Sequence, residues 1–278
     1  FFDNIDHELM LKAIDQQNPP KLVRLALVRW LKADVMYPDG SIESGESGTP
    51  QGGVISPLLA NLFLHYTFDK WMEREFPTLP FERYADDAII HCVSEKQAQY
   101  VLSKLKRRII DCKLELHPEK TKIVNCEVNT NKQVTNNKFD FLGFTFRRRG
   151  ASSTKSNTVF TSFLPAVGDK KKVVIKQKIK SFNWQAMLQK GLDNVAKVIN
   201  PYIRGIINDY SKFYQSELDE IWKTIDARLV RWIMKKHKRY KGKKTKSFNL
   251  LEEIKSSVRY RGLFAHWQFK LSTKAKTT

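Results

Sequence analysis

Apolar and polar positions over the first 150 residues switch between the spacing of a helix and that of a strand. Apolar residues at helical spacing predict three helices, which begin after Asp6, cover about 58–68 and run from about 94 to 111. Strict alternation predicts a strand over 139–146, and the Pro-Asp-Gly sequence within 35–42 predicts a tight hairpin. Helices mixed with antiparallel strands predict an α+β domain over residues 1–150.

Past residue 150 the pattern changes. Residues 151–180 are polar, basic and rich in Ser and Thr, which predicts a linker between domains. Apolar faces at helical spacing follow over 203–214 and 218–233, and Asn200-Pro201 is a suitable helix start. We therefore predict that residues 181–278 form an all-α domain.

The segment 81–93 is apolar on both sides of the adjacent carboxylates Asp86 and Asp87, which predicts a β-hairpin with both at its tip. Two ionised carboxylates side by side repel, so such a pair is stable mainly when a cation compensates it. Mg²⁺ prefers one or two carboxylates together with substrate phosphates, as in nucleotidyl transfer. Most Asp-Asp pairs are surface turns, but the flanking Tyr84-Ala85 and Ile89-Ile90 favour a rigid metal site here.

The charge of the chain is its most informative compositional feature. Lys and Arg number 49, Asp and Glu number 29, and the net charge is +20. Residues 1–100 contain 9 basic and 15 acidic side chains, whereas residues 101–278 contain 40 and 14. An acidic segment beside a strongly basic one suits an enzyme that holds divalent metal ions in one place and a phosphate backbone in another. Solubility alone needs far less asymmetry.

The basic excess is densest over 235–246, a run with no acidic residue, which predicts contacts with phosphates. No segment approaches the ~18 apolar residues of a membrane span, and no secretion signal opens the sequence. The three cysteines, Cys92, Cys112 and Cys126, are too widely spaced for a disulfide framework or a zinc site. These features predict an intracellular protein, cytoplasmic in a bacterium, without a membrane partner.

Several short motifs resemble those of one enzyme family. Tyr84-Ala85-Asp86-Asp87 resembles the metal-binding box of reverse transcriptases, and further boxes stand in the family's order. These are Phe1 to His7, Thr49 to Asn61, Leu116 to Thr121 and Phe141 to Phe144. Residues 200–205, with Phe264-Ala265-His266-Trp267, are similar to the maturase (thumb, or X) domain of group II intron-encoded proteins. The resemblance covers nearly the whole chain.

The resemblance implies a polymerase palm-like antiparallel sheet with helices, followed by a basic, all-α thumb/maturase domain. It implies RNA-directed DNA polymerase activity on an RNA template, a DNA primer and dNTPs. It also implies binding of group II intron RNA, with maturase activity that assists splicing and mobility. Asp86 and Asp87 would bind Mg²⁺ in a two-metal site.

The resemblance also assigns roles to individual residues. Phe2 would pack under the sugar of the incoming nucleotide, Gln51 would contact the same nucleotide, and Lys120 would lie near its phosphates. The primer terminus would be supported by Phe141, Leu142, Gly143 and Phe144. The basic side chains expected to grip RNA are Arg204, Lys235, Lys236, Lys238, Arg239, Lys241, Lys243 and Lys244. Each residue taken singly also fits a simpler role in a core, a turn or a solvated surface.

In this family the first catalytic Asp precedes the Phe-Phe pair by a few residues, and the printed sequence begins at Phe1. The resemblance therefore implies that one metal ligand, the fingers and the earlier boxes lie upstream. We expect the 278-residue chain alone to have little or no polymerase activity. No His-Asn-His nuclease signature follows residue 270.

Two alternatives stay open. The first is a non-catalytic RNA-binding splicing factor, against which the intact Asp86–Asp87 pair argues. The second is a reverse transcriptase of another bacterial class, from a retron or a diversity-generating element. The basic second domain argues against that class.

Overall fold

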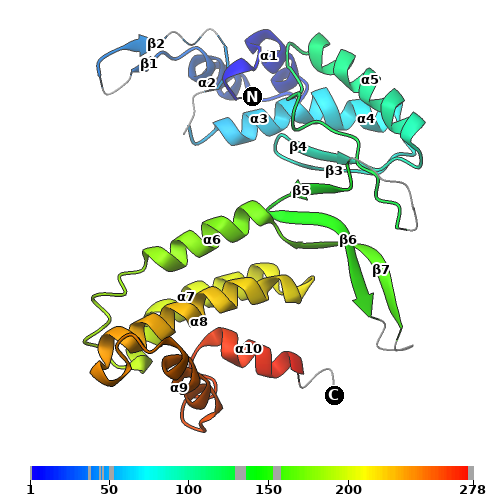
Figure 1. Cartoon of the computed structure of the whole chain (residues 1–278). Coiled ribbons are helices and arrows are strands. Elements are labelled where there is room, and N and C mark those ends of the chain that lie inside the picture. Colours follow the sequence, from blue (N-terminus) through cyan, green and yellow to red (C-terminus); the bar gives the residue numbers. More distant parts are fainter. Residues whose placement is uncertain are drawn as a thin grey trace. The chain divides into compact units, whose positions relative to one another are not determined.

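The computed structural model describes residues 2–36, 39–43, 45, 47–49, 53–128, 136–152 and 158–274. The chain forms two compact units, Phe1–Ile123 and Val124–Thr278 (Figure 1). Its helices are combined with antiparallel strand pairs, which confirms the predicted α+β class. In the part of the chain that the structure describes, no helix combines the length and apolar character needed to cross a membrane.

The first unit is mainly helical, with two short hairpins. Its helices are η1 (Phe2–Asn4), α1 (His7–Asp15), α2 (Lys21–Leu31), α3 (Ser56–Leu64), the π-helical turn η2 (His65–Asp69), α4 (Lys70–Glu75) and α5 (Glu95–Asp111). Its strands are β1 (Val35–Met36), β2 (Ile42–Glu43), β3 (Phe81–Tyr84) and β4 (Asp87–Ile90), paired as β1–β2 and β3–β4. The strand pairings expected for the hairpins over 35–42 and 81–93 are confirmed, and residues 37 and 38 lie outside the described residues.

Two of the predicted helices begin at side-chain caps. Asp6 accepts a hydrogen bond from the backbone N–H of Leu9 at 2.9 Å and so caps α1. Ser94 accepts one from Gln97 at 3.2 Å and caps α5. Such caps satisfy N–H groups that the first helical turn leaves unpaired, which is why these starts are readable from sequence.

Two apolar clusters form the core of this unit. The first joins α1, α2 and α3 around the fully buried Ile5, Met10 and Ile14. The second joins η2, α4 and α5 to the β3–β4 hairpin, with Met72 and Val101 at its centre. The hairpin that carries the adjacent carboxylates is therefore packed on one side against helices.

The second unit combines a three-stranded sheet with helices. Its strands are β5 (Lys138–Phe141), β6 (Phe144–Ser152) and β7 (Val159–Val167), in the antiparallel order β5-β6-β7. The helices that follow are α6 (Asp169–Ser181), α7 (Leu192–Tyr210), η3 (Gln215–Leu218), α8 (Asp219–Lys236), η4 (Lys238–Tyr240), α9 (Lys244–Ser256) and α10 (Ala265–Lys274) (Figure 1). One apolar cluster around Ile199, Ile203 and Trp222 joins the helices.

Three expectations differ from the structure. The segment 151–180, expected to be a linker, holds the end of β6, β7 and most of α6. Along the sequence, the boundary between the two compact units lies between residues 123 and 124. The expected strand over 139–146 turns back at Leu142 and Gly143, because φ values of +50° and +82° there suit a two-residue hairpin. The helix expected to start at Asn200-Pro201 begins at Leu192, and Pro201 lies inside it.

Asp226 on α8 binds two other helices of the second unit. It accepts hydrogen bonds from His266 Nε2 at 3.0 Å, Trp267 Nε1 at 3.1 Å and Lys255 Nζ at 2.8 Å. Burial alone would raise the pKa of Asp226, but the contacts with His266 and Lys255 outweigh it and hold that pKa well below its usual range. The Phe264–Trp267 motif thus serves the core: Phe264 and His266 are fully buried.

Glu217, in η3, is the centre of a second buried ion-pair network. Its carboxylate accepts hydrogen bonds from Arg147 at 2.7 Å, from Arg149, also on β6, and from Lys172 on α6. The Arg149 side chain is only 4% exposed and lies over the Tyr214 ring. Burial alone would raise the pKa of Glu217, but the hydrogen bonds from Lys172 and Arg147 outweigh it and hold the pKa at about 2. This network ties the sheet to the helices.

We predict that Glu217→Gln lowers the free energy of unfolding at pH 7 by about 3–5 kcal/mol, because the buried Arg149 loses its counter-charge and Lys172 keeps only the exposed Asp169 and Glu220. The folded pKa of Glu217, about 2, lies below the ordinary value of 4.5, so its contribution is complete above 4.5 and is lost as the pH falls toward 2. Denaturant unfolding of wild type and variant at several pH values measures the difference.

The control for this prediction is Asp219→Asn, which removes an exposed partner of Lys270 and should cost less than about 1 kcal/mol. A difference between wild type and Glu217→Gln that stays constant down to the lowest pH would contradict the assignment.

Candidate active site

The β3–β4 hairpin presents the adjacent carboxylates at its tip. Tyr84 pairs with Asp87 in the antiparallel register, which leaves Ala85 and Asp86 as a two-residue turn. Ala85 has a φ of +52°, a conformation that costs a residue with a side chain about 1 kcal/mol or more and persists only where surrounding contacts hold it. The turn therefore needs support from its neighbours.

Asp86 and Asp87 are both exposed. Across the described ranges, neither carboxylate forms a hydrogen bond or an ion pair, and no cluster of three or more His, Cys, Asp or Glu side chains is arranged to hold a metal ion. Two adjacent carboxylates without a cationic partner are the oxygen ligands that Mg²⁺ prefers. The donor set fits a divalent metal ion to which this chain contributes two carboxylates.

Arg83 supports the turn, and sequence reasoning missed it. Its guanidinium donates to both carboxylate oxygens of Asp69 at 2.6 Å, to Asn61 Oδ1 at 3.0 Å and to the backbone carbonyl of Ala85 at 2.9 Å. The pair with Asp69 is shielded, at 12% and 16% side-chain exposure. A signal was present, because Arg83 shares the inward face of β3 with the apolar Phe81.

Two predicted motifs that lie far apart in sequence are neighbours in the structure. The backbone N–H of Gly48 donates to Ile5 O at 2.8 Å, and that of Thr49 donates to Phe2 O at 2.9 Å. Gly48 has a φ of +78°, and a Cβ there would lie 2.7 Å from the backbone of Asp3. Only glycine permits this approach of the two segments.

The residues predicted to contact the nucleotide have different outcomes. Phe2 is half-buried and packs against the first core cluster. Gln51 lies outside the described residues. Lys120 is exposed in the irregular segment after α5, and no contact between described residues joins it to the carboxylates of Asp86 and Asp87. The structure thus does not bring Lys120 into a defined site.

The predicted primer-supporting segment is the β5–β6 turn of the second unit. Phe141 and Phe144 are paired across it, and the carbonyl of Gly143 accepts a hydrogen bond from Gly168 N at 2.9 Å. The ring of Phe144 lies 5.1 Å from that of Tyr210. The turn is therefore held against the start of α6 and the end of α7.

The basic side chains predicted to bind RNA are mostly exposed. Lys236 is the exception, because its ammonium donates to the carbonyls of Leu188 and Lys190 at 3.0 and 2.6 Å and lies over the Trp232 ring. The other seven are exposed, and none of the eight forms an ion pair with an acid in the described parts of the chain. The seven are Arg204, Lys235, Lys238, Arg239, Lys241, Lys243 and Lys244.

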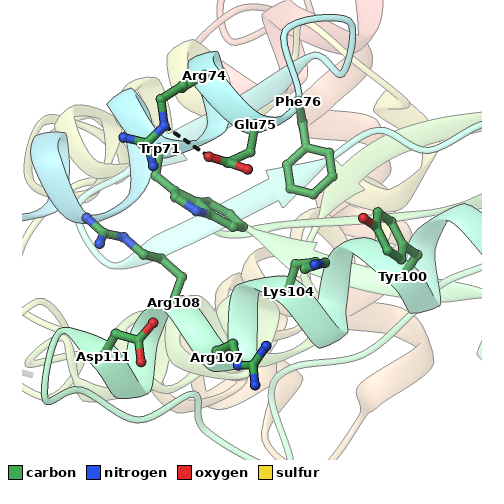
Figure 2. Close-up of a pocket in the computed structure, with 9 residues that line it drawn as sticks. All are labelled: Trp71, Arg74, Glu75, Phe76, Tyr100, Lys104, Arg107, Arg108 and Asp111. Carbon is green, nitrogen blue, oxygen red and sulfur yellow. Dashed lines mark hydrogen bonds and ion pairs between the residues drawn. The ribbon is translucent and has the colours of Figure 1, made fainter.

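A pocket of about 240 Å³ lies between α4 and α5 (Figure 2). Trp71 and Phe76 line it on the α4 side, and Tyr100, Lys104 and Arg107 are among its lining residues on α5. No residue predicted for catalysis or nucleotide binding lines it. The pocket is therefore separate from the carboxylate hairpin.

Two protein-family models match different parts of this chain. The reverse transcriptase (RNA-dependent DNA polymerase) family matches residues 1–146. The group II intron, maturase-specific domain matches residues 173–248. The second match disfavours the retron and diversity-generating classes, for which no maturase region was expected.

The chain is similar to the group II intron-encoded protein LtrA of Lactococcus lactis subsp. cremoris, at 26% identity over 75% of this chain and 47% of LtrA. It is also similar to the protein YkfC of Escherichia coli K12, at 25% identity over 58% of this chain and 48% of YkfC. The putative COX1/OXI3 intron 2 protein of Saccharomyces cerevisiae is 31% identical over 27% of this chain and 9% of its own length.

The chain thus spans about half the length of LtrA and YkfC. The reverse transcriptase match covers more than half of the chain and includes the carboxylate hairpin. The protein belongs to the reverse transcriptase family, in the group II intron class that also carries a maturase-specific domain.

Proposed function

We propose that this chain supplies metal-binding carboxylates and RNA-binding surfaces to an RNA-directed DNA polymerase encoded by a group II intron. The observation that carries the proposal is the exposed, unpaired Asp86–Asp87 pair on a two-residue turn, in a chain of the reverse transcriptase family. The palm would lie within residues 1–150 and the thumb/maturase region within residues 181–278, with β7 and most of α6 between them in place of a linker. The protein would act inside the cell on intron RNA.

The proposed chemistry is nucleotidyl transfer at the carboxylate hairpin. Mg²⁺ bound there would stabilise the attacking 3′ oxygen of the primer and the leaving pyrophosphate oxygen. Asp86 and Asp87 would hold the metal ions, with one further ligand from a segment ahead of Phe1. The substrates would be a dNTP, a DNA primer and an RNA template.

The remaining site residues would bind and orient these substrates. Phe2, half-buried beside the first core cluster, would limit the space under the nucleotide sugar. Gln51 would contact the same nucleotide, and Lys120 would approach its phosphates. Phe141, Leu142, Gly143 and Phe144 would support the primer terminus, since contacts with α6 and α7 fix this turn.

The exposed basic side chains of the second unit would bind intron RNA. Unlike Lys172 and Lys255, which are ion-paired with acids, the seven exposed side chains predicted to bind RNA have no acidic partner within the described residues and are available to phosphates. The protein would then recognise the shape and the backbone of intron RNA. This binding would be the basis of its maturase function.

We expect Asp86→Asn and Asp87→Asn each to lower the rate of primer extension on an RNA template by at least about a hundredfold, because each removes a metal-ligand charge. The assay uses Mg²⁺ and compares the 278-residue chain with a protein that also carries the family's upstream Asp segment. We expect cDNA only from the longer protein.

The matched control is Asp111→Asn, which changes an equally exposed carboxylate at the end of α5. If the longer protein bound intron RNA but made no cDNA, the non-catalytic splicing factor would be the better account.

For the RNA surface, we expect Lys241, Lys243 and Lys244 changed together to Gln to reduce the slope of log K against log salt for intron RNA by about 2. Each lost phosphate contact removes about 0.7–0.9 from the slope. The control changes three exposed lysines of α5, Lys96, Lys104 and Lys106, and should leave the slope nearly unchanged. Equal losses in both triple variants would contradict the proposed RNA surface.

A further inference from the structure

We propose that Arg83 is a positioning residue for the Asp86–Asp87 carboxylates and that the π-helical turn η2, held from its other side by Arg108, is its anchor. This inference rests on the proposed function and goes beyond it, because neither arginine is among the residues expected to touch metal or substrate. The whole arrangement lies in the first unit, between α3, η2, the β3–β4 hairpin and α5.

Arg83 uses all three guanidinium nitrogens as donors. Its Nε and one terminal nitrogen bind both oxygens of Asp69, and the other terminal nitrogen binds Asn61 Oδ1 and Ala85 O. Ala85 carries the positive φ of the turn, and its carbonyl belongs to the peptide that leads directly to Asp86. One planar guanidinium thus joins the turn to α3 and to η2.

Asp69 is the carboxylate partner of Arg83. It ends η2, the five-residue π-helical turn in which the N–H of Lys70 bonds to His65 O. A π-helical turn is rare and is frequent at functional sites, because it rotates the following side chains relative to an α-helix. His65 Nδ1 also lies 3.4 Å from Asp69, so the carboxylate faces a cation and an imidazole.

Arg108 binds the backbone of this turn. Arg108 on α5 donates from Nε to Thr67 O at 3.0 Å and from a terminal nitrogen to Tyr66 O at 3.1 Å. Figure 2 shows Arg108 extending from α5 toward the neighbouring helix. Both carbonyls belong to η2, whose widened turn weakens the regular helical ladder. Two arginines therefore hold η2. Arg83 binds the side chain of Asp69, and Arg108 binds two backbone carbonyls of the turn.

Only arginine can make this set of bonds at position 83. A lysine ammonium could pair with Asp69 as a point charge, but it lacks the planar fork that also reaches Asn61 and Ala85. The carboxylates would then keep their charge and identity but lose a fixed turn geometry. Because misplacement of reacting groups by about 1 Å can cost on the order of a hundredfold in rate, a positioning role predicts a kinetic effect without loss of a ligand.

The test is single-turnover primer extension with Arg83→Lys in the longer protein described under the proposed function. We expect the rate at saturating dNTP to fall at least tenfold and the Mg²⁺ concentration for half-maximal rate to rise several-fold, with intron RNA affinity unchanged. Arg24→Lys is the matched control, because Arg24 makes an equally bidentate but exposed pair with Asp15. Asn61→Ala removes one of the bonds and should give a smaller effect in the same direction.

A second measurement on the 278-residue chain needs no catalysis. Arg83→Lys should speed amide hydrogen exchange over residues 85–88 at least tenfold relative to Arg24→Lys, while exchange in α1 stays unchanged. If the unaltered longer protein makes no cDNA, the proposed function fails and exchange alone decides the positioning role. Rate, Mg²⁺ dependence and exchange within twofold of the Arg24→Lys control would overturn the inference.

Discussion

The two-residue turn that carries Asp86 and Asp87 is the constraint on which the candidate active site of this protein depends. Asp86 and Asp87 stand on a two-residue turn, exposed and without a partner among the described residues, and the turn includes a residue in a costly backbone conformation. A hairpin tip of this kind is not stable by itself. The surrounding structure compensates through the Arg83 guanidinium, which fixes the turn, and through the apolar cluster beneath the strands.

The second unit contains buried charges of both signs, which form ion pairs. Glu217 neutralises the shielded Arg149 and Lys172, and Asp226 joins α8 to α9 and α10 through Lys255, His266 and Trp267. Paired in this way, Arg149, Lys172 and Lys255 are compensated within the fold. The exposed cations of η4 and the start of α9 are not, which leaves a surface suited to a polyanion.

Local signals explain what the sequence predicted well. The helix starts after Asp6 and near Ser94 and the hairpin around Asp86–Asp87 depend on residues within a few positions of one another, and all are confirmed. The carboxylate pair could be recognised as a candidate site for the same reason. Its metal-binding role, like the roles of Phe2, Gln51 and Lys120, stays a prediction.

Long-range contacts explain what the sequence did not predict. The polar segment expected to be a linker contains β7, whose register is set by pairing with β6. The helix around Pro201 extends back to Leu192, and Asn200, expected near a helix start, instead bonds to Leu263 and Ala265. The π-helical turn depends on Arg108, which is 41 residues away from Thr67. The pattern of apolar and polar residues in a short stretch of sequence cannot predict partners that lie so far apart along the chain.

The central claim is that the Asp86–Asp87 hairpin binds a divalent metal ion, and nuclear magnetic resonance with Mn²⁺ tests it most directly. Bound Mn²⁺ broadens the signals of nearby amides, so a titration of the 278-residue chain locates the ion without requiring catalysis. The account predicts that the amides of Ala85 to Ala88 broaden at the lowest Mn²⁺ concentrations and that Asp86→Asn combined with Asp87→Asn abolishes this response. Earlier broadening elsewhere, or an unchanged response in the double variant, would contradict it.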